Sequence, residues 1–248
     1  MKIAKTLFEG LKKNRLLRPV KPIIETLEGI VLGSPEATVG APHFLDHIEI
    51  KRYMSTVILA LIPATVAAVV FFGWYVLAMI LTSYVVGGFI EVAFALIRKK
   101  EIEEGFLVTG LIFPLILPPT APLWVVAVGI AFGVFFGKEV FGGTGRNIFN
   151  PALVGRIFIT IAFPQIMSAT WRMPFSDAIT AATPLAVYRS SQAAAPYLDL
   201  LLGQVAGSTG EVFRIGIIAG AVLLMMTRVS SWRITLSYLG TVALFAFV

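Results

Sequence analysis

The stretch that decides the fold is residues 53–97, YMSTVILALIPATVAAVVFFGWYVLAMILTSYVVGGFIEVAFALI. It contains a single charged residue, Glu91, and divides at Gly73–Trp74 into two apolar runs. The hydrocarbon core of a bilayer is about 30 Å thick, and a helix needs about 20 apolar residues to cross it. We therefore predict two membrane-spanning helices, over residues 53–73 and 75–97, joined by a tight turn.

The rest of the chain has the same apolar character. Of its 248 residues, 57% are hydrophobic and 14% are charged, whereas soluble domains have about 25% charged residues. We expect an all-α integral membrane protein, a polytopic helix bundle. Two apolar runs are short, and Pro114 interrupts the first of them, so we expect broken or half-length helices, with tilted and proline-kinked helices as the alternative. The further apolar runs are residues 106–118, 122–137, 151–163, 211–227 and 232–248.

The positions of Lys and Arg predict the orientation, because cytoplasmic loops are enriched in them. Residues 1–52 are the most basic part of the chain, so we predict a cytoplasmic N-terminal segment there, followed by a membrane domain over 53–248. Alternation then places the stretch 164–209 on the outer face. The net charge of +6 reflects membrane topology rather than nucleic-acid binding, since no basic face with interleaved aromatic residues accompanies it.

Residue usage excludes several chemistries. The chain has no cysteine, which excludes disulfides, thiolate-held iron–sulfur clusters and cysteine-based catalysis within it. The only histidines are His43 and His47, whose spacing would place both on one face of a helix. A metal pair and a solvated approach segment are both compatible with that spacing, and we assign no metal site and no catalytic residue.

A glycine-rich turn, GKEVFGGTGRNIFNPALVGR (137–156), links two apolar runs. The glycines between positions 142 and 145 predict backbone turns with positive φ. Asn150 followed by Pro151 predicts a helix that begins at Pro151 with Asn150 as its cap. Asn147 and Asn150 also offer donors and acceptors that could bind the edge of a planar heterocycle such as isoalloxazine. A purely structural turn and cap is equally compatible with these residues.

Paired glycines and an acid lie within the second predicted span. Gly87 and Gly88 allow close approach of either another helix or a planar ligand. Glu91 lies one turn beyond Gly87 on the same helix face, and an acid at membrane depth is often functional. Either it has a role with a cation or a proton, or it reaches the surface or pairs with Arg98.

The stretch SDAITAATPLAVY (176–188) interrupts the apolar runs with polar residues. One interpretation is a short helix capped by Asp177 or Thr180, with Thr183 at its third position. The other is a modification site, because the alanines beside Thr183 leave its hydroxyl accessible next to an acid.

This stretch resembles the acceptor motif for covalent flavin attachment, Asp-x-x-Ser/Thr-Gly-Ala-Ser/Thr. The resemblance implies that a flavin transferase links FMN through its phosphate to Thr183, with Asp177 and Thr180 as recognition residues. One position departs from the motif, since Ala181 stands where glycine is usual.

Four further stretches, APHFLDHIEIKRYMSTVILALIPA, FGGTGRNIFNPALVGRIF, GSTGEVF and SSWRI, extend the resemblance over residues 40–248. Together they resemble the NqrB subunit of the sodium-translocating NADH:quinone oxidoreductases, with the RnfD subunit of the Rnf complexes as a near relative. The implied fold is a bundle of two inverted halves like that of a urea channel. Because the chain is shorter than the family's full-length members, we expect it to end after the start of the second half.

The resemblance also implies cofactors, partners and a location. Asn147 and Asn150 match residues that hold noncovalent riboflavin, and Gly87 and Gly88 match a pair linked to quinone reduction. The implied function is electron transfer from FMN through riboflavin to quinone, coupled to Na⁺ export, in a multi-subunit complex of the bacterial inner membrane. Three alternatives remain: an Rnf ferredoxin:NAD oxidoreductase subunit, a flavin-free urea-channel-like transporter, and an inactive fragment.

Overall fold

A computed structural model describes residues 50–99, 105–176 and 182–246, and in this part every regular element is helical. The predicted all-α class is therefore confirmed. The first helices of the described part are α3 (Ile50–Phe72), α4 (Tyr75–Arg98), α5 (Gly105–Leu115), α6 (Leu123–Gly137), the 3-10 turn η2 (Glu139–Phe141) and α7 (Pro151–Ala162). They are followed by α8 (Pro164–Ala169), α9 (Pro184–Ser191), α10 (Tyr197–Leu202), α11 (Arg214–Met226) and α12 (Trp232–Ala246).

Three helical segments of the described part are long and apolar enough to cross a bilayer: Arg52–Phe72, Tyr75–Arg98 and Leu123–Phe141. Shorter apolar helices cover Gly105–Leu115, Pro151–Ala162 and Arg214–Met226. These bounds agree with the predicted spans to within a few residues. At 11 residues, α5 is about 16 Å long, roughly half the thickness of the hydrocarbon core. The prediction of half-length helices is thus confirmed for α5.

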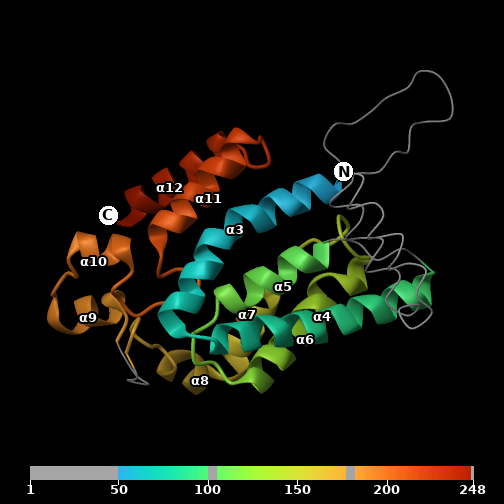
Figure 1. The fold of residues 1–248 in the computed structure, drawn as a ribbon, viewed down its shortest axis with the longest axis horizontal. Coiled ribbons are helices and arrows are strands. Elements are labelled where there is room, and N and C mark those ends of the chain that lie inside the picture. The colour runs from blue at the N-terminus through green and yellow to red at the C-terminus, as the bar shows by residue number, and fades with distance from the viewer. Residues whose placement is uncertain (1–49, 100–104, 177–181, 247–248) are drawn as a thin grey trace, which may run out of the picture.

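Helices α4 to α7 form the packed centre of the bundle (Figure 1). The turn at Gly73–Trp74 lets α3 and α4 run in opposite directions, and α11 packs on α3 away from this centre. The central core consists of apolar side chains from α4, α5, α6 and α7, among them Met79, Phe113, Val126, Ile130 and Ile159. A second core joins the end of α3 to the start of α4, to the end of α5 and to the segment just before α11, through Phe72, Val76, Leu115 and Val212.

A line of glycines brings the backbones of α6 and α7 into contact. Gly129, Gly133 and Gly137 recur every four residues and so lie on one face of α6. A Cβ atom on Gly133 would lie 2.3 Å from the carbonyl oxygen of Pro151, and one on Gly155 would lie 2.5 Å from that of Gly129. Small residues at this spacing are the usual means by which membrane helices pack closely. The start of α7 is therefore held against the end of α6.

The backbone carbonyl groups at the end of α5 accept hydrogen bonds from a segment much later in the chain. After Leu115 the chain leaves the helix, and its carbonyl groups need donors inside the protein. The amide of Gly210 donates to the carbonyl of Leu115 at 2.7 Å, and that of Thr209 donates to the carbonyl of Leu117 at 2.9 Å. Thr209 is 1% exposed. The stretch 164–209, expected as an outer-face loop, is thus partly buried at its C-terminal end.

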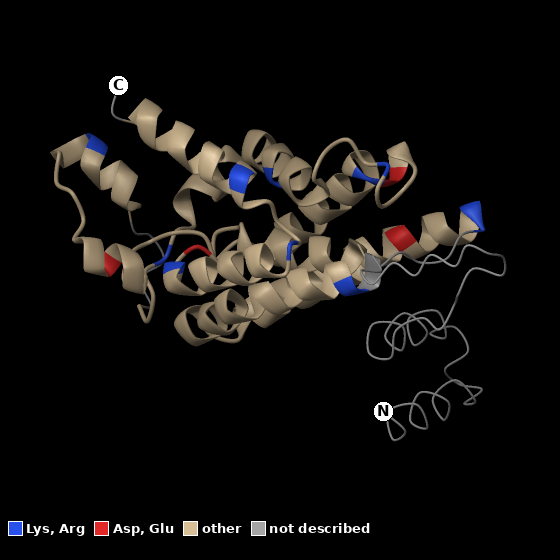
Figure 2. Ribbon diagram, turned by 90° about the horizontal axis from the view of Figure 1, so that it is seen from above, with Lys and Arg blue, Asp and Glu red and all other residues tan. Residues whose placement is uncertain are grey.

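Charged residues gather toward the two ends of the helices (Figure 2). Two hydrogen bonds identify which segments share an end. The hydroxyl of Tyr53, near the start of α3, donates to the carbonyl of Val229 between α11 and α12 at 2.8 Å. The amide of Phe175 donates to the carbonyl of Phe71, near the other end of α3, at 3.1 Å. The polar stretch that leads to Thr183 therefore starts at the end of the bundle opposite to the α11–α12 turn.

Replacing Gly133 with alanine tests the glycine contact between α6 and α7. The new methyl group would overlap the Pro151 carbonyl, so we expect the free energy of unfolding to fall by about 2 kcal/mol. Gly240→Ala on α12 is the matched control, since a Cβ there meets no atom within 4 Å. Thermal unfolding in detergent measures both variants, and equal melting temperatures would refute the contact.

Candidate functional site

One end of the bundle collects most of the predicted site residues. Here α6 ends at Gly137, and the chain turns through η2 and residues 142–150 before α7 begins at Pro151. Gly142, Gly143 and Gly145 have φ of 118°, 101° and 80°, which confirms the predicted positive-φ turns. This turn lies between the C-terminal part of α4 and the start of α5, because Lys138 contacts Glu91 and Thr144 lies against Gly105.

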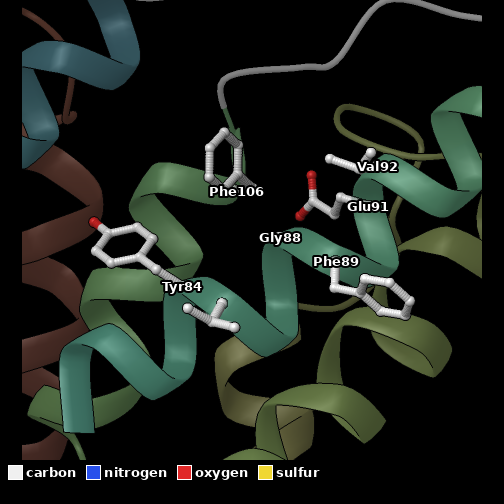
Figure 3. Close-up of a pocket in the computed structure, with 7 residues that line it drawn as sticks. Tyr84, Gly88, Phe89, Glu91, Val92 and Phe106 are labelled. Carbon is white, nitrogen blue, oxygen red and sulfur yellow. The ribbon is translucent and has the colours of Figure 1, made fainter. Parts of the chain in front are cut away.

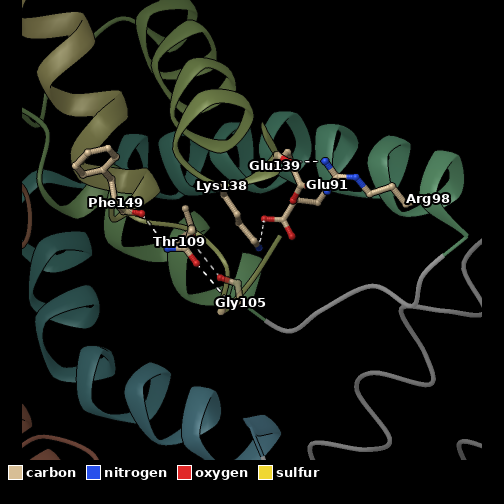
Figure 4. Close-up of polar contacts among 9 residues, drawn as sticks. Glu91, Arg98, Gly105, Thr109, Lys138, Glu139 and Phe149 are labelled. Carbon is tan, nitrogen blue, oxygen red and sulfur yellow. Dashed lines mark hydrogen bonds and ion pairs between the residues drawn. The ribbon is translucent and has the colours of Figure 1, made fainter. Parts of the chain in front are cut away.

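Two ion pairs join α4 to the end of α6 (Figure 4). The ammonium group of Lys138 donates to the carboxylate of Glu91 at 2.7 Å, and both side chains are at most 5% exposed. Farther along α4, at its last residue, the guanidinium group of Arg98 contacts the carboxylate of Glu139 at 3.0 Å and also donates to the Glu139 carbonyl. The four side chains carry no net charge together. Burial of charged groups at this depth is tolerated only when they are paired in this way.

The burial of Glu91 excludes one of its predicted alternatives. At 5% exposure the carboxylate does not reach the protein surface, so a position at the bundle exterior is excluded. Lys138 is its partner, whereas the sequence had suggested Arg98. Lys138 stands immediately after the α6 glycines, and the contact of α6 with α4 brings it to Glu91.

The two predicted asparagines have local structural roles. The Asn150 side-chain carbonyl accepts hydrogen bonds from the amides of Ala152 at 2.9 Å and Leu153 at 3.4 Å, which confirms the predicted cap of α7. The Asn147 side chain accepts from the amide of Gly145 at 3.2 Å and donates to the carbonyl of Phe149 at 2.9 Å. The side chains of Ile148 and Phe149 are mostly exposed beside them. The turn therefore presents amide groups together with apolar surface.

An apolar pocket of about 290 Å³ lies beside Glu91. Figure 3 shows the Phe106 ring and the Glu91 carboxylate on opposite sides of the space above Gly88. The phenol of Tyr84, whose ring contacts Phe106 edge-on, donates to the carbonyl of Leu107 at 2.7 Å. The walls are otherwise apolar, from Val85, Phe89 and Val92.

The paired glycines have different surroundings, and one of the two predicted uses, helix packing, is observed at Gly87. A Cβ atom on Gly87 would lie 3.1 Å from a side-chain carbon of Ile130 in α6, so Gly87 permits helix packing. Gly88 lines the pocket, and its Cβ would lie 3.9 Å from the Phe106 ring. One turn before Gly87 on the same face of α4, the fully buried Ser83 hydroxyl has no hydrogen-bond partner among the described residues.

Thr183 lies at the opposite end of the bundle, at the start of α9. Its side-chain oxygen accepts a hydrogen bond from the amide of Ala186 at 3.4 Å, which makes Thr183 the cap of α9. The prediction that Thr183 occupies the third position of a helix is wrong, because Pro184 supplies the first helical residue. Asp177, Thr180 and Ala181 lie outside the described residues, as do His43 and His47.

The described residues contain no group of three or more His, Cys, Asp or Glu side chains that could hold a metal ion. The features that sequence reasoning missed are Lys138, Glu139 and Phe106. Lys138 and Glu139 were visible as two adjacent charges at the end of an apolar run. Nothing in the sequence, however, indicated which α4 residues they meet.

The sequence matches known proteins over most of its length. A sequence model of the NQR2, RnfD, RnfE family matches residues 37–248. In the Na(+)-translocating NADH-quinone reductase of Klebsiella pneumoniae, the subunit named B is 36% identical over 273 residues, covering 86% of this chain and 66% of that protein. The subunit of the same name from Pseudomonas paraeruginosa is 46% identical over 166 residues, which cover 64% of this chain and 41% of that protein. The chain spans less than two-thirds of the length of these relatives.

Removing one partner of the buried ion pair tests its energetic role. Lys138→Leu leaves the Glu91 carboxylate buried without its cation, so we expect the free energy of unfolding to fall by about 3 kcal/mol or more. The double variant Glu91→Gln with Lys138→Leu removes both charges and should recover much of that loss. Thermal unfolding of the single and double variants measures the coupling, and additive effects would contradict a direct pair.

Proposed function

The chain belongs to the NQR2, RnfD, RnfE family, and on this basis we propose that it acts in a sodium-translocating NADH:quinone oxidoreductase. It would be the membrane subunit that carries covalent FMN and noncovalent riboflavin and passes electrons to quinone, coupled to Na⁺ export. The observation that carries the proposal is the 36% identity to a named subunit of such a reductase, which extends over 86% of the chain.

The surroundings of Thr183 fit a phosphoester anchor for FMN. The first amides of a helix have no partners within the helix, and they favour negative charge at that end. A phosphate group esterified to the Thr183 oxygen would lie at the start of α9, where such amides can donate to it. Pro184 fixes the helix start directly after the acceptor. Asp177 and Thr180 would serve as recognition residues for the flavin transferase.

The turn at the other end of the bundle fits riboflavin. The Asn147 and Asn150 side chains supply amide groups, and the exposed Phe149 ring and Ile148 side chain supply apolar surface for a planar ring. The side-chain carbonyl of Asn150 caps α7, so its amino group is the part that can donate to a ligand. The cap holds that group in a fixed direction.

The apolar pocket fits the ring of a quinone. Its walls are aromatic and aliphatic, and the Glu91 carboxylate is a polar group beside the space above Gly88. This combination of apolar walls and few polar groups is typical of small-molecule sites. Gly88 would keep the space open, and Lys138 would hold the Glu91 carboxylate in place.

Bound flavins would supply the redox chemistry, while the chain supplies positions and electrostatics. The chain's own part is to keep two binding regions at opposite ends of one helix bundle, and to keep the buried Glu91 carboxylate neutralised. The proposal assigns no residue to sodium coordination. Proposed partners are the other subunits of the complex, the flavin transferase and quinone.

The distribution of basic residues supports an orientation with the Asn147 turn inside and Thr183 outside the membrane, which we propose to be the bacterial inner membrane. Among the described residues, the end that contains the Asn147 turn carries Arg52, Arg98, Lys99, Lys138, Arg146, Arg156, Arg228 and Arg233. The opposite end carries Arg172, Arg189 and Arg214.

A second function is favoured by the family itself, whose description includes RnfD. The chain would then serve in a ferredoxin:NAD oxidoreductase with the same flavin anchor. A quinone-reduction assay on the assembled complex separates the two functions. A flavin-free transporter, the remaining alternative, is separated from both by the absence of covalent flavin.

Thr183 is expected to carry the covalent flavin. When the chain is expressed with its flavin transferase and separated on a denaturing gel, its band should fluoresce under ultraviolet light. Thr183→Asn should be dark, because asparagine caps α9 equally well but has no hydroxyl to esterify.

Thr183→Ser is the positive control for the acceptor, since it keeps both the cap and a hydroxyl, and its band should remain fluorescent. A dark wild-type band would defeat the covalent-flavin proposal. A fluorescent Thr183→Asn band would move the attachment to another residue, with Thr180 as the first candidate.

Gly88→Leu is expected to fill the pocket and weaken quinone binding. In the assembled complex we expect the KM for quinone to rise on the order of tenfold, because added bulk in an apolar site costs binding energy. Gly240→Leu on α12 is the control, as nothing lies within 4 Å of a Cβ there. An unchanged KM for Gly88→Leu would remove this pocket from the quinone site.

A further inference from the structure

The turn between α11 and α12 presents two arginines from a well-defined backbone. The amides of Val229 and Ser230 both donate to the carbonyl of Leu224 at 3.0 Å, and that of Arg228 donates to the carbonyl of Met225 at 3.2 Å. Arg228 has φ of 59°, the left-handed conformation that often ends a helix. The Tyr53 hydroxyl binds the Val229 carbonyl, which fixes the turn to α3.

Neither arginine of this turn has a carboxylate partner among the described residues. Arg228 and Arg233 are both exposed. The Arg233 guanidinium lies over the Trp232 ring, 5.7 Å from its centroid, and Trp232 itself is 58% exposed. Of the described carboxylates at this end of the bundle, Glu91 is paired with Lys138 and Glu139 with Arg98. Within the part of the chain that the structure describes, the positive charge of the turn is therefore uncompensated, and it lies beside an exposed indole ring.

The surface that continues from this turn is apolar. Trp232, Leu236 and Leu239 are spaced so that they share one face of α12, and each is 58% exposed. Tryptophan is enriched where membrane helices meet the headgroup region. Guanidinium groups bind phosphate oxygens through paired N–H donors, which a lysine cannot reproduce. The guanidinium groups therefore match a lipid headgroup, the indole ring matches the interface, and the apolar face of α12 matches an acyl chain.

We propose that Arg228, Arg233 and Trp232 form a binding site for an anionic phospholipid. The two guanidinium groups bind the phosphate of the headgroup, and an acyl chain lies along the Trp232–Leu236–Leu239 face of α12. The group that the two guanidinium groups bind is a phosphate anion, and its source is the lipid headgroup rather than free phosphate. This site does not depend on the flavin assignments, because it rests only on the geometry of the turn and on the membrane location.

Quenching of tryptophan fluorescence by brominated lipid tests the proposal. The full chain, with Trp74, Trp124 and Trp171 replaced by phenylalanine, is reconstituted in phosphatidylcholine bilayers with a minor amount of phosphatidylglycerol. Bromine is placed in the acyl chains of one lipid or the other. We expect brominated phosphatidylglycerol to quench Trp232 as if it bound roughly tenfold better than phosphatidylcholine.

Variants distinguish specific binding by the two guanidinium groups from attraction by general surface charge. The double variant Arg228→Gln with Arg233→Gln should lower the preference to about one, whereas Arg189→Gln, an exposed arginine at the other end, should leave it unchanged. Arg228→Lys with Arg233→Lys keeps the charge and should lose most of the preference. The lysine variant also serves if the glutamine variant does not fold.

Three results would overturn the proposal. Quenching by brominated phosphatidylglycerol no greater than its mole fraction in the bilayer predicts would show that no anionic lipid is selected. A double-lysine variant that matches the wild-type turn would reduce the effect to surface charge. Loss of the preference on addition of excess inorganic phosphate would identify free phosphate as the ligand, and persistence of the preference would support the lipid.

Discussion

The backbone contact between α6 and α7 is the constraint on which the rest of this bundle depends. Membrane helices gain little from burying apolar side chains against one another, because lipid is equally apolar, so close packing must hold them together. Gly129, Gly133 and Gly155 remove side chains where the two helices cross. The contact fixes the end of α6 relative to the start of α7. It thereby fixes Lys138 and the Asn150 cap, which lie at those two helix ends.

The charged side chains at that end follow from the same constraint. Once α6 is held between α4 and α7, Lys138 has α4 as its neighbour, and Glu91 provides the charge that its burial requires. The pair in turn defines one side of the apolar pocket beside Gly88. Packing, charge compensation and the shape of the candidate site are therefore linked through one helix end.

Much of this architecture is predictable from the chain alone, for reasons that are local. The length of apolar runs gave the helices, and Asn150 before Pro151 gave the start of α7, because a cap and a proline act on their own residues. Pairings over long sequence separations were not predictable in the same way. The contact of Lys138 with Glu91 and that of Thr209 with the end of α5 depend on how helices are arranged in space. The capping role of Thr183 was missed because two acceptable caps, Asp177 and Thr180, come just before it.

The position of Thr183 as the cap of α9 has a kinetic consequence for any group attached there. A β-branched side chain at a helix start has few rotamers, so an attached group would extend from a nearly fixed point on a short, stiff tether. Tethering turns an encounter between molecules into an encounter within one molecule, at an effective concentration set by tether length. The rate at which such a group meets its redox partner would then be independent of the cellular supply of free flavin.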